Sequence, residues 1–581
     1  MKTRMETVNV IINGRAYDVP KNATVLEAAK IAGVDIPTLC YLKDINEIGA
    51  CRLCLVEVKG ARGLVTACVY PVNEGMEITT NSPKIMEARR RNLELLLSGH
   101  DQNCLSCVRS TNCELQKLCR EYGVDSKAVT GRRNHYAIDD SGYSITRDNN
   151  KCILCRRCVA ACNNQGIGAI SAVNRGFDTE IGTEFGVPLA DTTCINCGQC
   201  IEACPVGALY EHDDTDKVFA ALADPSKHVV ISIAPSVRTA IGEAFGNPIG
   251  TDTEGKMVAA TKKLGFDGVY DLNFAADLTI MEEATELVER LKNGGKLPMI
   301  TSCSPGWIKF CEHYFPDMTE NLSSCKSPQQ MFGAIYKTYF AKKMGVKPED
   351  VVMVSCIPCT AKKFEVQRPD QNAAGVPDVD IAITTRELAR MISIAGIDYN
   401  ALSDEAFDDP IGKGTGAGII FGATGGVMEA ALRTAAEVVG GVSFKKLDVA
   451  PIRGVEGIKF ASYKLGDTTI NVAVASGTKN ANTLLKKVQN GELDLQFIEV
   501  MACPGGCVNG GGQPIVPASV KNSVDVRAIR ASVLYRADEA SDVRTSHENS
   551  AVKAVYDDFL GNPGSHLAHE ILHTTYIKRG R

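Results

Sequence analysis

The sequence predicts a multidomain α/β protein with α+β parts, in which three small domains precede one large α/β domain. A chain of 581 residues is too long for one core, since a domain mostly holds about 100 to 200 residues. It contains 23 cysteines, most of them before residue 210. Beyond residue 225, apolar strands alternate with amphipathic helices, which is typical of a largely parallel sheet. We place the domains at 1–82, 83–140, 141–212 and 225–524, with a mainly helical segment of the last domain at 525–581.

Composition narrows the class of protein. The net charge of −6, with 23% charged residues, predicts no surface for nucleic acid. No apolar run approaches the roughly 18 residues that span a bilayer, and residues 1–10 lack the pattern of a signal peptide. We therefore expect a cytoplasmic protein without a membrane span. In a reducing cytosol, so many cysteines indicate metal thiolates rather than disulfides.

The first domain opens with a hairpin signal, Asn13-Gly14, between two short apolar segments. Thr24 and Glu27 then form a capping box for a helix that begins near Val25. This order resembles a plant-type ferredoxin domain with a β-grasp fold. Four cysteines on the following loops fit a 2Fe-2S cluster, although their spacing alone leaves a zinc site open: Cys40, Cys51, Cys54 and Cys68.

The second domain is expected to be helical over about 82–125, with Arg89, Arg90 and Arg91 on a solvated helix face. A lone histidine near cysteines is usually structural. His100, however, precedes a C-x2-C pair at an offset that resembles the ligand pattern of a known 4Fe-4S centre. The expected ligands are His100, Cys104, Cys107 and Cys113. A neutral imidazole in place of a thiolate makes the cluster less negative, which raises its potential and suits a branch point.

The third domain carries a cysteine run that repeats with a 42-residue offset, C-x2-C-x2-C-x3-C, and the second copy ends on Pro205. In two-cluster bacterial ferredoxins the fourth cysteine of each run binds the other cluster. The expected 4Fe-4S ligands are therefore Cys152, Cys155, Cys158 and Cys204 for one cluster, and Cys194, Cys197, Cys200 and Cys162 for the other. Together with the first two sites, these make one 2Fe-2S and three 4Fe-4S accessory clusters. Such a series of clusters is expected to transfer electrons.

Three cysteine-bearing segments stand out in the large domain, at 301–307, 357–365 and 499–514. Glycines in the last segment allow a bulky inorganic group to approach the backbone. From the residues alone, these segments indicate one more cluster. They also resemble the three signature segments of FeFe (iron-only) hydrogenases, and with the accessory sites the similarity covers essentially the whole chain.

The resemblance implies an enzyme that interconverts 2H⁺ + 2e⁻ with H2 at an H-cluster. In this family the H-cluster joins a 4Fe-4S cluster, through a cysteine thiolate, to a two-iron subsite with carbonyl, cyanide and a dithiolate amine. The resemblance makes Cys359, Cys503 and Cys507 the iron ligands, with Cys507 bridging. It also places polar and packing contacts to the two-iron subsite on further residues: Lys362, Pro235, Ser236 and Met501.

A proton route is also expected. Glu283, Glu286 and Arg290 share one face of a helix predicted over 278–292, which by itself suggests a solvated ion-pair face. With a thiol and Ser323 they resemble the family's proton relay. A carboxylate can pass protons in such a chain when burial raises its pKa.

The fourth ligand of the active-site 4Fe-4S cluster is ambiguous. In the family two adjacent cysteines precede Pro-Gly-Trp, the first donating protons and the second binding iron, whereas this chain has Cys303-Ser304. A metal readily deprotonates a cysteine, whose pKa is near about 8.5, but not a hydroxyl. The backbone argues against exchanging these two roles, because adjacent side chains along an extended chain point to opposite sides. We favour Cys303 as the ligand and Ser304 as the proton donor, and the reverse assignment stays open.

The expected electron partner is ferredoxin or a flavoprotein subunit that uses NAD or NADP. The serine at position 304 resembles that of chains from multisubunit enzymes, a class that includes electron-bifurcating ones. The loop 412–418 lacks a phosphate-binding ending, and no dinucleotide fingerprint occurs, so nucleotide chemistry belongs to another chain. Maturation proteins must supply the two-iron subsite. The alternatives are a non-catalytic electron-transfer or cluster-assembly protein and a hydrogen sensor.

Overall fold

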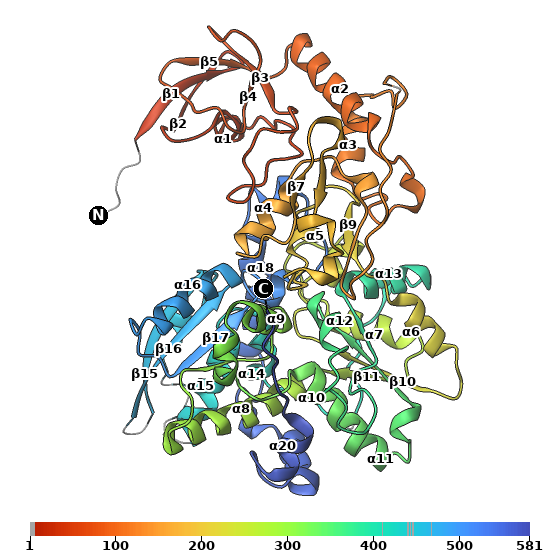
Figure 1. The fold of residues 1–581 in the computed structure, drawn as a ribbon, viewed down its shortest axis with the longest axis vertical. Helices are drawn as coiled ribbons and strands as arrows, with labels where there is room; N and C mark the ends of the chain where they lie inside the picture. Colours follow the sequence, from red (N-terminus) through yellow and green to blue (C-terminus); the bar gives the residue numbers. More distant parts are fainter. Residues whose placement is uncertain are drawn as a thin grey trace.

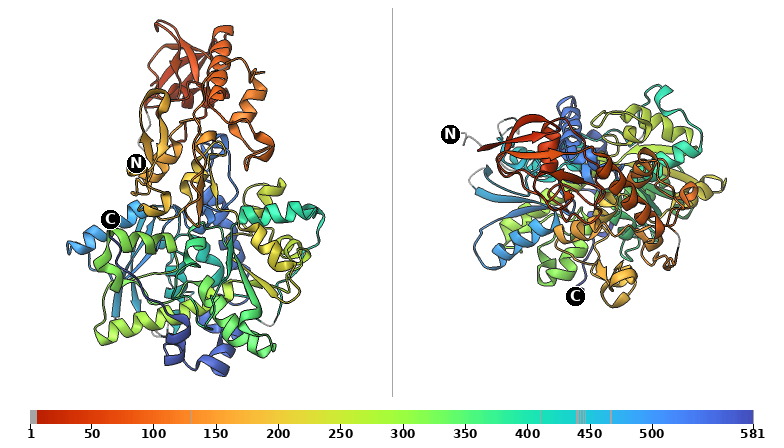
Figure 2. Two further views of the ribbon diagram at one scale, coloured as in Figure 1. Left: turned by 45° about the vertical axis from the view of Figure 1, so that its right-hand side comes forward. Right: turned by 90° about the horizontal axis from the view of Figure 1, so that it is seen from above.

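The computed structural model describes residues 6–580 apart from 130, 410, 439, 440, 442, 444, 446, 466 and 467. Residues 1–5 and 581, which begin the first predicted domain and end the last, lie outside the described residues. The cysteine-rich N-terminal third stands on one side of a larger two-sheet body (Figures 1 and 2). Within the described part of the chain, no helix has the length and apolarity needed to cross a membrane.

The first domain has the predicted β-grasp fold. Asn13 and Gly14 both have positive φ, as a tight hairpin turn requires, and the Thr24–Glu27 capping box starts helix α1 (Val25–Ile31). The sheet order is β2-β1-β5-β3-β4. Its strands are β1 (Thr7–Ile12), β2 (Arg15–Pro20), β3 (Leu55–Val58), β4 (Val65–Thr66) and β5 (Met76–Thr79).

The second domain is less helical than predicted. Helices α2 (Pro83–Ser98) and α3 (Glu114–Glu121) flank a loop whose one helical element is a short 3-10 turn, so the prediction of helix across 99–113 was wrong. The solvated-face prediction was also wrong for Arg89, which is buried and donates to the Leu55 carbonyl at 2.8 Å. Burial of this guanidinium fixes α2 against the first domain.

The third domain repeats its structure as well as its sequence. Helices α4 (Arg157–Asn164) and α5 (Gln199–Ala203) each begin inside a cysteine run, behind a left-handed residue at Arg156 or Gly198. Short antiparallel pairs complete the unit: β6 (Ile145–Arg147) with β9 (Leu209–Glu211), and β7 (Ser171–Val173) with β8 (Glu180–Gly182).

The large domain contains two four-stranded sheets, so the largely parallel α/β prediction is confirmed. One sheet is wholly parallel, in the order β11-β10-β13-β14, and the other, β12-β17-β16-β15, is antiparallel only between β15 and β16. The strands are β10 (His228–Ile233), β11 (Gly268–Asp271), β12 (Met299–Ile300), β13 (Val351–Cys356), β14 (Ile381–Ile383), β15 (Ile458–Leu465), β16 (Thr468–Ser476) and β17 (Phe497–Met501).

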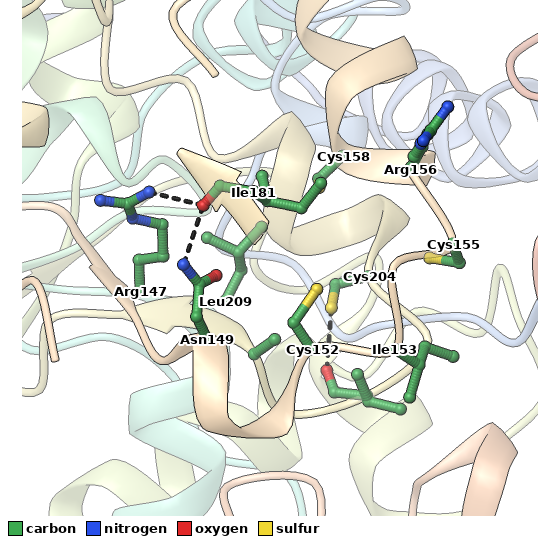
Figure 3. A pocket seen from close by; sticks show the side chains of 12 residues that line it. Arg147, Asn149, Cys152, Ile153, Cys155, Arg156, Cys158, Ile181, Cys204 and Leu209 are labelled. Carbon is green, nitrogen blue, oxygen red and sulfur yellow. Dashed lines mark hydrogen bonds between the residues drawn. The ribbon is translucent and has the colours of Figure 1, made fainter. Parts of the chain in front are cut away.

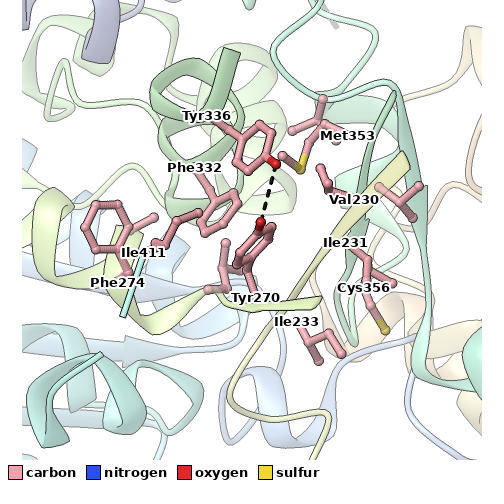
Figure 4. Close-up of a cluster of buried hydrophobic side chains, with 14 of the residues drawn as sticks. Val230, Ile231, Ile233, Tyr270, Phe274, Phe332, Tyr336, Met353, Cys356 and Ile411 are labelled. Carbon is pink, nitrogen blue, oxygen red and sulfur yellow. Dashed lines mark hydrogen bonds between the residues drawn. The ribbon is translucent and has the colours of Figure 1, made fainter. Parts of the chain in front are cut away.

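Helix α8 (Asn273–Asn293) joins the two halves of this domain. It begins five residues before the predicted start at Leu278 and ends at Asn293, one residue beyond the predicted end, with Gly294 as its C-cap. Phe274 belongs to the core of the parallel sheet, which Figure 4 shows, whereas Ile280 belongs to the core of the mixed sheet. Further helices pack around the sheets: α6 (Thr215–Leu222), α7 (Glu254–Lys263), α9 (Pro305–Tyr314), α10 (Pro328–Ile335), α12 (Ala361–Glu365), α13 (Thr385–Ile394), α14 (Gly416–Ile419), α15 (Gly426–Val438) and α16 (Thr478–Gln489).

The C-terminal segment is mainly helical, as predicted. It contains α18 (Val526–Glu539), α19 (Ser550–Val555) and α20 (His566–Leu572). Helix α20 lies at the bottom of the view in Figure 1 and packs against α10. The segment therefore belongs to the large domain rather than forming a separate unit.

Candidate metal centres

The four cysteines of the first domain converge on one buried point. The sulfurs of Cys54 and Cys68 lie 3.3 Å apart, and the backbone N–H of Cys51 donates to the Cys40 sulfur at 3.4 Å. Hydrogen bonds from the Cys51 and Cys68 thiols lower the pKa of Cys40. A hydrogen bond from the Cys68 thiol also lowers the pKa of Cys54. A compact set of four cysteines, two of them with a lowered pKa, fits a metal–thiolate centre.

The predicted imidazole site lies in the loop between α2 and α3. His100 is buried, burial lowers its pKa, and its Nδ1 atom has no hydrogen-bond partner among the described residues. A neutral imidazole with an unbonded nitrogen can bind a metal. Burial and the neighbouring Cys107 raise the pKa of Cys104, and burial raises that of Cys113, so both thiols need a nearby cation to ionise.

One cavity in the third domain is lined by four cysteines from both runs, Cys152, Cys155, Cys158 and Cys204 (Figure 3). Burial raises the pKa of Cys200 well above its usual range, and the charges of Cys197, Cys194 and Cys162 add to this effect. The structure thus brings Cys204 together with the first run, and it brings Cys162 close to the second run, which is the arrangement that exchanged ligand sets would need.

Both N-terminal sites touch that cavity. The Asn46 side-chain amide donates to the Cys40 carbonyl at 2.7 Å and to the Cys155 carbonyl at 3.1 Å. From the imidazole site, Arg109 donates to the Cys204 carbonyl at 3.0 Å. The first site therefore contacts the cysteines of the Cys152 cavity at Cys155, and the second site contacts them at Cys204. We call these two connections the two arms that meet at the Cys152 cavity.

The second thiol set of the third domain lies against the large domain. The Thr360 hydroxyl donates to the Asn196 carbonyl at 2.7 Å, and the Gln199 side chain donates to the Asn509 carbonyl at 2.9 Å. The Cys503 sulfur lies 3.8 Å from the Cys197 carbonyl oxygen. A metal centre held by this thiol set would therefore lie close to the cysteines of the large domain.

The large-domain cysteines meet beyond the carboxyl ends of strands from both sheets. Cys359 follows β13, and Cys503 and Cys507 follow β17. Burial raises the pKa of Cys507 to about 12, with a further contribution from Cys359, and the pKa of Cys503 is raised by burial, Cys359, Cys197 and Cys507. Such a group of buried thiols ionises only around a cationic centre.

The glycines of the third segment allow this convergence. A Cβ atom on Gly510 would lie 1.8 Å from the Pro358 carbonyl oxygen, and one on Gly506 would lie 2.7 Å from the Thr424 backbone nitrogen. Both contacts are closer than a side chain tolerates, and Gly506 also has a positive φ. The segment therefore closes over the cysteine group only because these residues lack side chains.

Polar groups surround the same space. Lys362 is buried, and its Nζ atom donates to the Cys303 carbonyl at 3.1 Å and to Glu365 at 2.9 Å. Ser236, which follows Pro235 beyond β10, is fully buried, and its hydroxyl has no partner among the described residues. Met501 is buried at the end of β17. An orphaned buried hydroxyl fits the presence of a bound polar group.

Cys303 and Ser304 have different neighbours. Burial and then the charge of Glu283 raise the pKa of the Cys303 thiol, on which Cys507 also acts. Ser304 caps α9, and its hydroxyl accepts from the backbone N–H of Ala502, next to Cys503. The thiol is thus electrostatically coupled to Glu283, whereas the hydroxyl lies on the Cys503 side.

The predicted relay residues are brought together. Burial and the Glu286 charge raise the pKa of Glu283 to about 8, against the opposing effect of hydrogen bonds from the Ser323 hydroxyl and the Ser302 backbone. Glu286 accepts from the Ser323 hydroxyl and from Arg290 Nε, each at 3.1 Å. The solvated-face alternative fails for Glu283, which is only 1% exposed.

Sequence reasoning missed several groups here. Cys325 is buried, as are Cys311 and Cys356, and its sulfur lies 3.8 Å from Glu286 Oε2. His573 bonds Glu282 and Ser324. No sequence pattern links residues so distant. In the loop 412–418, the amides of Gly414 and Thr415 donate to carboxylates, which agrees with the absence of a phosphate site.

Comparison with known families matches five consecutive models along the chain. They are a 2Fe-2S iron–sulfur cluster binding domain (5–83), the NADH-ubiquinone oxidoreductase-G iron–sulfur binding region (89–128), a 4Fe-4S dicluster domain (151–208), the C-terminal domain of the iron only hydrogenase large subunit (227–511) and the iron hydrogenase small subunit (524–579).

Relatives match over the full length. The NADP-reducing hydrogenase subunit HndD of Solidesulfovibrio fructosivorans is 49% identical, covering 99% of this chain and 100% of its own. Iron hydrogenase 1 of Clostridium pasteurianum is 46% identical over 98% and 100%. A solved structure of apo [FeFe]-hydrogenase HydA1 from Chlamydomonas reinhardtii superposes with a TM-score of 0.57 at 40% identity, covering 64% of this chain and 100% of that one.

Proposed function

This chain belongs to the iron-only (FeFe) hydrogenase family, and we propose that its large domain turns over hydrogen at an H-cluster held by Cys359, Cys503 and Cys507. The observation that carries the proposal is the convergence of these three thiols beside the orphaned Ser236 hydroxyl and the buried Lys362 ammonium. When bound, the cluster supplies the metal at which two protons and two electrons combine to form H2.

The surrounding residues would hold and insulate that cluster. Lys362 and Ser236 provide hydrogen-bond donors for its diatomic ligands, Pro235 brings the adjacent backbone close, and Met501 contributes an apolar wall. Water is excluded because the glycine-rich segment packs directly on neighbouring backbone. The site therefore supplies fixed polar groups in a dry cavity, where electrostatic interactions are strong.

For the fourth iron position we propose Ser304, with Cys303 as the proton donor. This reverses the assignment that thiolate chemistry favours. Two contacts support it: the Glu283 charge acts on the Cys303 thiol, and the Ser304 hydroxyl lies beside the backbone that leads to Cys503. Protons would then enter beside Arg290 and pass through Glu286, Ser323 and Glu283 to Cys303, with the raised pKa keeping Glu283 protonated near neutral pH.

We propose that four accessory clusters carry the electrons, one 2Fe-2S in the first domain and three 4Fe-4S in the next two. The two arms that meet at the Cys152 cavity support exchange with two partners. Because a full-length relative is named as a subunit of an NADP-reducing hydrogenase, the proposed partners are flavoprotein subunits that use NAD or NADP, with ferredoxin as the second acceptor. The proposed location is the cytoplasm.

The test is activity before and after maturation. Made without hydrogenase maturation proteins, the chain is expected to contain iron and sulfide but to evolve no hydrogen, because only the two-iron subsite needs dedicated synthesis. Adding a synthetic subsite should start hydrogen evolution. Activity in the unmatured chain would contradict the proposal, and a reconstituted chain without activity would favour the assembly or sensor alternatives.

A further inference from the structure

We propose that Glu286, Cys325 and His573 form a binding site for a borderline divalent cation such as Zn²⁺. One ligand atom from each of the three residues lies within 4.8 Å of the others. The Cys325 sulfur and Glu286 Oε2 are 3.8 Å apart, close to the separation of about 3.5 to 4 Å that two ligands have around one zinc ion. The inference rests on the proposed function in one respect, which is that Glu286 belongs to the proton relay.

Three distant segments hold these ligands in place. Glu286 lies on α8, Cys325 precedes α10, and His573 directly follows α20. Cys325 and His573 are paired by an antiparallel backbone bridge, so their relative position is fixed by the main chain. An inward movement of about 1 Å or less brings all three atoms to zinc distances of about 2.0 to 2.3 Å.

The donor set suits this class of cation. A thiolate, an imidazole and a carboxylate are common zinc ligands, and water can fill the fourth position. The two ring nitrogens of His573 bond Ser324 Oγ at 2.7 Å and Glu282 at 3.1 Å. Whichever nitrogen binds the metal, the other keeps a partner that orients the ring. Binding exchanges the Cys325 thiol proton for the cation, and that proton is released to solvent.

Charge and access also favour the cation. The negative charges of three carboxylates, those of Glu282, Glu283 and Glu286, surround the Cys325 thiol and would attract a cation. The guanidinium of Arg290, which bonds Glu286 on its far side, partly offsets this negative charge. The His573 ring packs against the exposed His569 ring at a tilt of 34°, with their centroids 4.0 Å apart. An incoming cation could therefore bind His569 at the surface before it reaches the three proposed ligands.

Occupancy would remove the Glu286 carboxylate from the relay and so slow hydrogen turnover. The experiment titrates zinc chloride into holoenzyme whose clusters are fully loaded, and records both hydrogen evolution and zinc X-ray absorption. We expect one zinc ion with one sulfur ligand at about 2.3 Å and nitrogen or oxygen ligands at about 2.0 Å. His573→Gln and Cys325→Ala should each raise the half-inhibitory zinc concentration by at least about tenfold, which is 1.4 kcal/mol of binding free energy.

The matched control is Cys311→Ala, because Cys311 is an equally buried thiol outside the site, and its zinc sensitivity should equal that of the unchanged protein. A zinc ion without a sulfur ligand, or equal sensitivity in His573→Gln, would overturn the site. Zinc bound with the expected ligands but without inhibition supports the site and contradicts the relay through Glu286. The X-ray absorption result stands even if the proposed hydrogenase reaction fails.

Discussion

Gly198 of the third domain and Gly511 of the large domain face each other at backbone contact. A Cβ atom on Gly198 would lie 2.9 Å from the Gly511 Cα and 2.5 Å from the Thr360 hydroxyl oxygen. This contact closes the junction between the last accessory thiol set and the active-site cysteines. In the proposed relay, this contact would set the distance that electrons cross between the two centres.

Gly198→Ala is predicted to disturb this junction. The added methyl group forces the two segments apart, which costs about 1 to 3 kcal/mol, and should slow severalfold the hydrogen evolution driven through the accessory clusters. Gly176→Ala is the matched control, because Gly176 also has a positive φ but has open space around its Cβ position. Equal rates for the two variants, measured with the same reduced dye, would contradict a role for the contact.

Glu283→Gln is predicted to lower turnover by at least about 100-fold, because the amide keeps the shape of the buried side chain but cannot donate and recover a proton. The spectra of the clusters should change little. Glu289→Gln, on the exposed side of the same helix, serves as the control and should retain full turnover. Turnover of Glu283→Gln within about threefold of the unchanged protein would exclude Glu283 from the relay.

Protonation of Glu283 should follow pH in a defined direction. Burial disfavours the charged carboxylate and raises its pKa from the ordinary 4.5 to about 8, so the acid form persists at neutral pH and is lost as pH rises through 8. Difference infrared spectra against Glu283→Gln should show a carboxylic acid carbonyl band that fades near pH 8. Loss of this band already near the ordinary carboxyl pKa would contradict the assignment.

Alanine variants separate the roles of Cys303 and Ser304. Cys303→Ala should keep a complete active-site 4Fe-4S cluster but stop turnover, because the proton donor beside Glu283 is lost. Ser304→Ala should instead alter the paramagnetic resonance signal of that cluster. Iron content, resonance spectra and hydrogen evolution measure both variants. Loss of the cluster in Cys303→Ala would restore Cys303 as the iron ligand.

Features set by a few neighbouring residues could be predicted from the sequence. The Asn13-Gly14 turn and the Thr24–Glu27 capping box depend on local geometry, and both form as expected. The meeting of Cys152, Cys155, Cys158 and Cys204 around one cavity could also be predicted, because the spacing of the repeat is that of two-cluster ferredoxins. Local chemistry therefore accounts for most of the accessory sites.

Long-range burial of polar groups could not be predicted. Arg89 belongs to a basic run, but the Leu55 carbonyl that receives its hydrogen bond lies 34 residues away. The start of α8 was missed because Asp277 interrupts the apolar pattern, although it is buried and accepts hydrogen bonds from Thr415. Tertiary partners, which one sequence does not reveal, decide both cases.

The infrared spectrum of the matured protein tests the central claim most directly, because carbonyl and cyanide bound to iron absorb in a region where protein groups do not. The account predicts carbonyl and cyanide bands that shift under hydrogen. Both sets of bands should be lost in Cys507→Ala and retained in Cys311→Ala. A fully reconstituted, iron-replete chain without these bands, or with bands unchanged in Cys507→Ala, would contradict an H-cluster at this site.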